Sequence, residues 1–218
     1  MKRGSQAGFT LVEVLVALLV MALMAAMAWQ GVDGIVRSRD ASQRRLESTL
    51  RMNTVVAQWE QDLVSLLETA SVPPLTFDGA TLRLTRRAPG GVQLVAWSLR
   101  KLETGDTLQR WASPATTTRA ELQDHWLRSQ QFQGSEPGQL SALQGVSQWQ
   151  VYFYRGNAWS NAQSSADVSA PAVPAASPAA AASAPLRQVL PSGVRLVLEF
   201  AEGSGASGSL IRDTLLGP

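Results

Sequence analysis

The sequence predicts an α+β protein in which one long N-terminal helix packs on antiparallel β-sheet. Three observations lead to this prediction. An apolar segment from Phe9 to Trp29 continues into a second segment with helical spacing, Pro73 and Pro74 follow, and period-two alternation typical of strands occupies most of the remaining chain. A helix that precedes a run of strands, rather than alternating with them, favours the α+β class.

The composition fits one folded domain with additional segments. The chain has 218 residues, 45% of them apolar, and all but one of its seven tryptophans follow Trp29. The formal net charge is +2, and from Phe9 onward basic and acidic side chains balance, which argues against nucleic-acid binding. Because the chain has no cysteine, it forms neither disulfides nor thiolate metal sites.

The segment from Phe9 to Trp29 is long enough to cross a membrane. As an α-helix, about 21 residues rise about 31 Å, which matches the hydrocarbon core of a bilayer. Lys2 and Arg3 precede the segment, so the positive-inside rule keeps the N-terminus in the cytoplasm. Everything after Trp29 is then expected outside the cytoplasm.

An ordinary secretory signal peptide on a secreted enzyme is the alternative explanation of this N-terminus. Ala26, Met27 and Ala28 would then be the cleavage site before Trp29. Two features argue against it. The carboxylate of Glu13 costs on the order of 2–3 kcal/mol in a bilayer, without purpose in a peptide that is removed, and the helical pattern continues past Ala28.

The stretch Gly8-Phe9-Thr10-Leu11-Val12-Glu13, behind a short basic leader, resembles the processing site of type IV prepilins and type II secretion pseudopilins. The resemblance implies that a prepilin peptidase cleaves between Gly8 and Phe9 and methylates the new amino group of Phe9. It also implies that Glu13 is an assembly contact, which faces the N-terminal amine of a neighbouring subunit. Glu13 can alternatively snorkel toward lipid headgroups, since it lies only about 6 Å along the helix from Phe9.

The helix is expected to continue from residue 30 to 72, where Pro73 ends it. Gly31 and Gly34 each cost about 1 kcal/mol in a helix interior, so the helix is expected to bend or fray there. Apolar residues then return at spacings of three and four, which predicts a face that lies on the sheet. This stripe consists of Leu46, Leu50, Val56, Trp59, Leu63 and Leu66 or Leu67.

Three acidic residues of the same segment, Glu60, Asp62 and Glu68, fall on the flanks of this stripe and are expected to be solvated. Beyond Pro74 the pattern predicts strands and one short helix. The strands are expected at 81–87, 92–102, 108–113, 148–155, 193–201 and 208–216, and the helix at 118–130. Residues 160–186 are rich in Ala, Pro and Ser, which predicts a disordered insertion because such a segment buries too little apolar surface to fold.

Four later stretches narrow the resemblance to the J-type minor pseudopilin of type II secretion: LTRR, LQRW, LQGVSQWQVYFYRGNAW and LPSGVRLVLEF. This resemblance implies a pilin-like fold and a tip complex with I-type and K-type pseudopilins. That complex primes the pseudopilus and supports export of folded proteins across the outer membrane. H-type and major pseudopilins are further candidate partners. A minor pilin of a type IV pilus, serving adhesion, motility or DNA uptake, stays open as the alternative.

The expected organisation is a leader at 1–8, a membrane segment at 9–29, a periplasmic helix at 30–72 and a periplasmic domain at 73–218. The chain would cross the bacterial inner membrane once, with its C-terminal domain in the periplasm.

No pattern in the sequence indicates an enzyme. The chain has a single histidine, His125, whereas zinc sites need three or four convergent ligands, so His125 is expected to be exposed or to cap the short helix. No nucleophile motif and no phosphate loop occurs. The sequence therefore predicts no catalytic residue, no metal, no cofactor and no small-molecule substrate.

Overall fold

The structure is a computed structural model that describes residues 8–101, 105–132, 134, 136–163, 190–204, 206 and 208–217. The chain divides into two units, Met1–Glu47 and Ser48–Pro218. The elements, in chain order, are α1 (Leu11–Val64), β1 (Leu75–Phe77), β2 (Thr81–Ala88), β3 (Gly91–Arg100), β4 (Thr107–Ala112), α2 (Arg119–Ser129), β5 (Gln139–Gln144), β6 (Val146–Arg155), β7 (Ala158–Asn161), β8 (Gly193–Phe200) and β9 (Ser209–Leu215).

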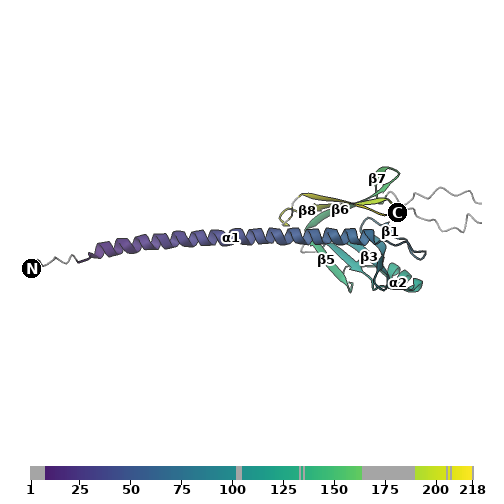
Figure 1. Cartoon of the computed structure of the whole chain (residues 1–218), viewed down its shortest axis with the longest axis horizontal. Helices are drawn as coiled ribbons and strands as arrows, with labels where there is room; N and C mark the ends of the chain where they lie inside the picture. Colours follow the sequence, from purple (N-terminus) through teal and green to yellow (C-terminus); the bar gives the residue numbers. More distant parts are fainter. Residues whose placement is uncertain are drawn as a thin grey trace, which may run out of the picture. The chain divides into compact units, whose positions relative to one another are not determined.

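The strands form two antiparallel sheets. One sheet has the order β1-β2-β3-β4-β5 and is a meander, and the other has the order β7-β6-β8-β9. Within the second unit, the last turns of α1 lie with β6 and β8 on one side and β3 and β5 on the other (Figure 1). The prediction of a long helix on antiparallel sheet is confirmed. The sequence pattern predicted the individual strands but not their division into two sheets.

Trp59 of α1 connects both sheets to the helix. Its ring lies edge-to-face against Trp97 of β3, with centroids 5.5 Å apart, and against Trp149 of β6, at 6.3 Å. Each such aromatic pair contributes about 0.5–1.5 kcal/mol beyond its buried area. Leu63 follows one turn later and is also buried. The core therefore forms where the C-terminal part of α1 meets inward-facing residues of both sheets.

The predicted helix end at residue 72 is wrong, because α1 ends at Val64. The residues that follow pair with the edge of β2 instead. The N–H of Leu67 donates to the carbonyl of Thr85 at 2.9 Å, and the N–H of Arg87 donates to the carbonyl of Ser65 at 2.8 Å. An unpaired edge of β2 would leave buried backbone groups without partners, so this pairing competes successfully with one more helical turn.

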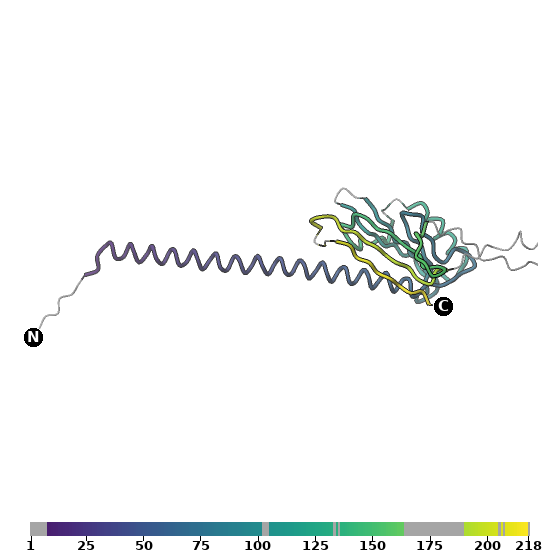
Figure 2. The backbone as a smooth tube through the Cα atoms, turned by 90° about the horizontal axis from the view of Figure 1, so that it is seen from above, coloured from purple at the N-terminus to yellow at the C-terminus, as the bar shows by residue number. Residues whose placement is uncertain are grey.

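The expected bend at Gly31 and Gly34 is also absent, because α1 is helical throughout this region (Figure 2). Both glycines have open space around them. The ion pair between Asp33 and Arg37 spans the same turn and supports it locally.

The start of the predicted apolar stripe is wrong as well. Leu46 and Leu50 are 58% and 56% exposed, whereas Val55 is buried beside Trp59. The packed face of α1 thus begins near Val55. Glu68 is exposed, as expected, and the placement of Asp62 is described below.

The remaining elements follow the sequence prediction closely. All six predicted strands are present, the last two as a hairpin, and α2 occupies the predicted helix with Thr118 as its N-cap. Strands β1, β5 and β7 were not predicted. The predicted insertion at 160–186 lies largely outside the described residues, and its first two residues belong to β7.

Gly91 fixes the close approach between the β2–β3 hairpin and the chain before α2. Its φ is +144°, and a Cβ there would lie 2.3 Å from the carbonyl oxygen of Thr116. Val92 and Thr116 exchange two backbone hydrogen bonds of 2.8 Å at this point. Only glycine allows both the φ value and this contact without displacement.

Candidate functional site

The predicted processing site lies directly before α1. Gly8 and Phe9 have no regular secondary structure, and both are exposed, Phe9 to 87%. No heavy atom lies within 4 Å of a Cβ placed on Gly8. The peptide bond between the two residues is therefore open to approach within the described part of the chain.

Thr10 and Glu13 form a capping box at the start of α1. The N–H of Glu13 donates to Thr10 Oγ1 at 3.3 Å, while the N–H of Thr10 donates to Glu13 Oε2 at 2.9 Å. Thr10 Oγ1 also donates to Glu13 Oε2 at 2.8 Å. These reciprocal bonds satisfy two of the N–H groups that a helix start leaves unpaired. Sequence reasoning missed the role of Thr10, although the spacing T-x-x-E signals it.

The apolar segment that follows has no packing partner among the described residues. α1 contains an apolar stretch long enough to cross a membrane, and none of that stretch is buried. Phe9, Leu11 and Trp29 are its most exposed large apolar side chains. A soluble core helix would bury such residues, so the segment needs a lipid or protein environment outside the chain.

Asp62 is fully buried, which corrects the expectation that it is solvated. Its Oδ1 accepts hydrogen bonds from Gln58 Nε2 at 2.9 Å, Arg86 Nη1 at 2.8 Å and Arg110 Nη2 at 2.9 Å. Its Oδ2 accepts from Trp97 Nε1 at 2.9 Å and Arg110 Nε at 2.8 Å. We call Asp62 with Gln58, Arg86, Trp97 and Arg110 the Asp62 cluster.

The Asp62 cluster joins the helix to three positions of the meander. Arg86 lies on β2, Trp97 on β3 and Arg110 on β4. Each oxygen of the Asp62 carboxylate accepts at least two hydrogen bonds. The two guanidinium groups together carry one positive charge more than is needed to neutralise the carboxylate. A carboxylate held this way is a structural anchor, since it presents no free lone pair to a substrate.

Two exposed ion pairs stabilise β9. Arg195 of β8 donates to Asp213 through Nε and Nη2, both at 2.7 Å, which lowers the pKa of Asp213 and raises the pKa of Arg195. Arg212 donates to Glu60 of α1, and this hydrogen bond raises the pKa of Arg212. Glu60 is therefore paired rather than simply solvated.

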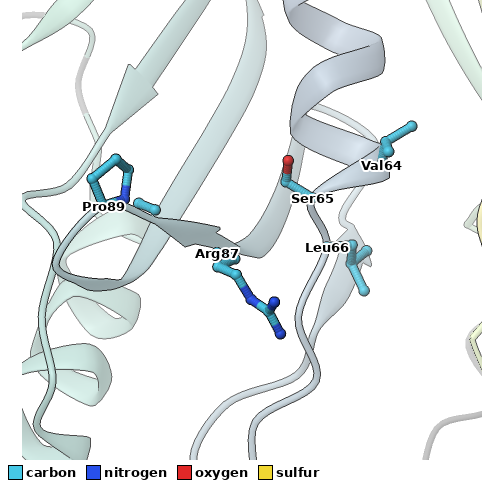
Figure 3. A pocket seen from close by; sticks show the side chains of 6 residues that line it. Val64, Ser65, Leu66, Arg87 and Pro89 are labelled. Carbon is cyan, nitrogen blue, oxygen red and sulfur yellow. The ribbon is translucent and has the colours of Figure 1, made fainter.

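The described residues present no constellation suited to catalysis. An open hollow of about 610 Å³ lies beside the end of α1, lined by Val64, Ser65, Leu66, Arg87, Ala88 and Pro89 (Figure 3). Arg87 is the single ionisable residue of this lining, so the hollow offers no acid–base pair. His125 is half-buried and lies edge-to-face against Trp111, with ring centroids 6.5 Å apart.

The match to a known family covers the N-terminal segment. The family model described as the prokaryotic N-terminal methylation motif matches residues 3–29. This range contains Gly8, Phe9, Thr10 and Glu13 together with the apolar part of α1. The exposed apolar helix and this motif are consistent with a pilin anchored in the inner membrane.

Proteins with this motif are processed by a prepilin peptidase and assemble with other pilins, and they are typically non-enzymatic structural subunits. The motif stands at the start of a long helix whose other end packs against antiparallel sheets, as in the pilin fold. The chain thus combines the N-terminal methylation motif of type IV pilins and pseudopilins with a pilin-like α+β fold.

Proposed function

We propose that this protein is a J-type minor pseudopilin of a type II secretion system. Residues 1–8 are its leader, residues 9–29 anchor it in the inner membrane, and the domain after the anchor lies in the periplasm. Together with I-type and K-type pseudopilins it forms the tip complex, which primes the pseudopilus and supports export of folded proteins. The observation that carries the proposal is the methylation motif on an exposed apolar helix that ends in a folded domain.

Processing is proposed at the bond between Gly8 and Phe9. Support comes from the exposure of both residues and from the open space around Gly8. Cleavage removes the charges of Lys2 and Arg3, which otherwise hold the N-terminus in the cytoplasm. The new amino group of Phe9, once methylated, is the N-terminus of the mature chain.

Glu13 is proposed as the assembly contact. In the single subunit its carboxylate accepts from Thr10, and both residues are exposed. A carboxylate has about four lone-pair sites, so Glu13 can cap its own helix and still accept from the amine of a neighbouring Phe9. Pairing these two charges reduces the cost of each in a low-dielectric bundle of helices.

The J-type assignment rests on the four later stretches, each of which contributes structural residues to the folded domain. LTRR and LQRW supply Arg86 and Arg110, the two arginines of the Asp62 cluster. The two longer stretches contain β6 and β8, which are paired neighbours in the second sheet. The likeness thus falls on residues that build the domain rather than on its loops.

Co-purification with I-type and K-type pseudopilins tests the proposed partners. The full chain, expressed with both, is expected to form a ternary complex, whereas association with pilus subunits instead would reject the secretion role and favour the type IV pilus. Glu13→Ala should leave cleavage at Gly8 intact and impair incorporation. Normal secretion by that variant would count against the role given to Glu13, and Thr10→Val serves as the control that removes the cap but keeps the carboxylate.

A further inference from the structure

Strand β9 forms one border of the second sheet, and its outer edge is unpaired. The sheet order β7-β6-β8-β9 places β9 last, and among the residues that the structure describes no strand lies beyond it. The N–H of Leu216 donates to the carbonyl of Ser192, and the N–H of Phe200 donates to the carbonyl of Gly208. Even-numbered residues of β9 therefore bond to β8, because hydrogen-bonded pairs alternate along an antiparallel ladder. The odd-numbered residues, whose N–H and C=O groups consequently point to the outer edge, are Ser209, Ile211, Asp213 and Leu215.

This outer edge lacks the features by which proteins usually prevent strand pairing. Exposed edges are normally protected by short strands, proline, lysine or a bulge. β9 has seven residues, SLIRDTL, with no proline and no lysine, and its register with β8 is unbroken. By contrast, the edge strands β1 and β7 have three and four residues, and the pairing of the edge strand β5 contains a register shift. Of these four strands, β9 is therefore the one best able to accept another strand.

Two exposed apolar side chains lie along the outer edge of β9. Ile211 and Leu215 are 58% and 80% exposed. Thr214 is buried, so by the alternation of a strand Ile211 and Leu215 point away from the core. Asp213 lies between them, and its carboxylate accepts two hydrogen bonds of 2.7 Å from Arg195. The edge thus offers backbone donors and acceptors, two apolar side chains and one charge that is already paired.

We propose that the outer edge of β9 binds an extended strand of a different protein, which adds to the second sheet. Strand addition at a sheet edge takes its affinity from backbone hydrogen bonds and its specificity from alternate side chains. The partner strand therefore carries apolar side chains four residues apart, opposite Ile211 and Leu215, with an uncharged polar residue opposite Asp213. This inference goes beyond the proposed function and does not depend on it.

A second copy of this chain fits the edge less well than a strand of a different protein. The antiparallel register that sets Ile211 opposite Leu215 of the second copy also sets Asp213 opposite Asp213. Like charges directly opposite each other destabilise a pair of strands. An uncharged residue at the centre of the added strand avoids this repulsion, and this favours a partner with another sequence.

Isotope labelling of isoleucine provides a direct probe of the edge. The chain contains two isoleucines, Ile211 and Ile35. Ile35 lies within α1, so its N–H has a hydrogen bond inside the helix and serves as the internal control. The full-length chain in detergent, with a nitrogen isotope in isoleucine alone, therefore gives two amide NMR signals. The rate at which each N–H exchanges with solvent is measured separately.

The partner strand is represented by the synthetic peptide Lys-Thr-Val-Thr-Thr-Thr-Val-Thr-Lys, blocked at both ends. Its valines are four residues apart, to lie opposite Ile211 and Leu215, and its central threonine lies opposite Asp213. At saturating peptide the exchange of the Ile211 N–H should slow at least about tenfold, whereas that of Ile35 should change less than about twofold. A control peptide with proline in place of the central threonine keeps both valines but lacks one backbone donor to β9. It should leave both exchange rates unchanged.

Two lysine substitutions test which edge binds the peptide. Leu215→Lys places a charge on the edge of β9 and should weaken peptide binding at least about fivefold, while Ile211 stays available as the reporter. Leu140→Lys is the matched control, because Leu140 is 61% exposed on the edge strand β5, and it should leave binding unchanged. An Ile211 signal near its original position in the absence of peptide verifies that each variant is folded.

Four outcomes overturn the proposal. The exchange of Ile211 does not slow at peptide concentrations up to about 1 mM, which corresponds to a binding free energy of about 4 kcal/mol. The proline peptide slows it equally. Leu140→Lys abolishes binding while Leu215→Lys does not. Ile211 is protected without peptide, to a degree that rises with protein concentration, which would assign the edge to a second copy.

Discussion

Replacing Asp62 with asparagine is expected to destabilise the folded domain more than any exposed charge replacement. Asparagine keeps the volume of the side chain but removes the negative charge and turns one acceptor oxygen into an NH₂ donor. In either orientation of the amide, at least two of the five hydrogen bonds are lost, because each carboxylate oxygen accepts at least two. Arg86 and Arg110 also lose the carboxylate that pairs with both of them.

The size of the effect follows from the burial of the cluster. A buried donor left unpaired costs about 1–3 kcal/mol, and breaking a buried ion pair costs about 3–5 kcal/mol. The side chains of Arg86 and Arg110 keep 18% and 11% of their surface exposed, so water relieves part of the loss. We therefore expect about 3–5 kcal/mol, a large fraction of the about 5–15 kcal/mol that stabilises a typical domain.

Urea unfolding of a fragment that begins at residue 30 measures this loss. The fragment omits the apolar anchor but retains the unit Ser48–Pro218 and the packed part of α1. We predict that this fragment folds on its own, and a cooperative unfolding transition in urea would verify it. Thermal unfolding of the Asp62→Asn fragment should occur about 6–20 °C lower, since about 1 kcal/mol shifts the midpoint by about 2–4 °C in a domain of this size.

Asp124→Asn is the matched control. It makes the same chemical change in an ion pair with Arg128 whose side chains are 51% and 69% exposed, where the expected cost is at most about 0.5 kcal/mol. An Asp62→Asn variant as stable as the Asp124→Asn variant would refute the claim that the Asp62 cluster holds the helix on the meander.

Three further predictions concern the same fragment. Trp59→Ala should cost about 3–5 kcal/mol, measured by urea unfolding, because this buried ring contacts both sheets. Gly91→Ala should cost about 1–3 kcal/mol, since its Cβ would meet a carbonyl oxygen, whereas Gly90→Ala, with open space around it, should cost less; equal costs would contradict the clash. The hydrogen bond from Arg195 lowers the pKa of Asp213, so this pair should stabilise the fold above about pH 4, the unfolded value, and lose its contribution as the pH falls through the folded pKa. Asp213→Asn should therefore reduce the fall in the free energy of unfolding as the pH is lowered below 5, measured by urea unfolding at a series of pH values. An unchanged pH dependence would contradict the stabilising role of this pair.

Local patterns in the sequence predicted most of the secondary structure. Alternation at 81–87 and 193–201 corresponds to β2 and β8, and the polar, turn-flanked helix at 118–130 corresponds to α2. Strands β1 and β7 were not predicted because they have only three and four residues, too few to show the period-two alternation of a strand. The two sheets could not be separated because strand pairing between distant segments leaves no local pattern.

The placement of Asp62 could not be predicted, because its partners are distant in the chain. Arg86, Trp97 and Arg110 lie 24, 35 and 48 residues away. On the helical pattern alone, an acidic residue between Trp59 and Leu63 looks like a flank. Its burial becomes stable only when the meander brings two guanidinium groups and an indole N–H to one point.

The end of α1 was missed for a related reason. Pro73 and Pro74 are strong local signals for a helix end, but the pairing of Ser65 and Leu67 with β2 ends the helix earlier. The capping box at Thr10 and Glu13 is different, since the spacing T-x-x-E is entirely local. It could have been identified from the sequence, and it locates the helix start two residues after Phe9.

The mass and sequence of the mature N-terminus test the central claim most directly. The full chain is expressed in cells with a prepilin peptidase, isolated from the inner membrane and fragmented for mass spectrometry. We predict an N-terminal peptide that begins at Phe9 and carries one methyl group on its amine, with Gly8→Ala blocking its formation. A mature chain that begins at Trp29, or a full-length chain with its leader intact, would contradict the account.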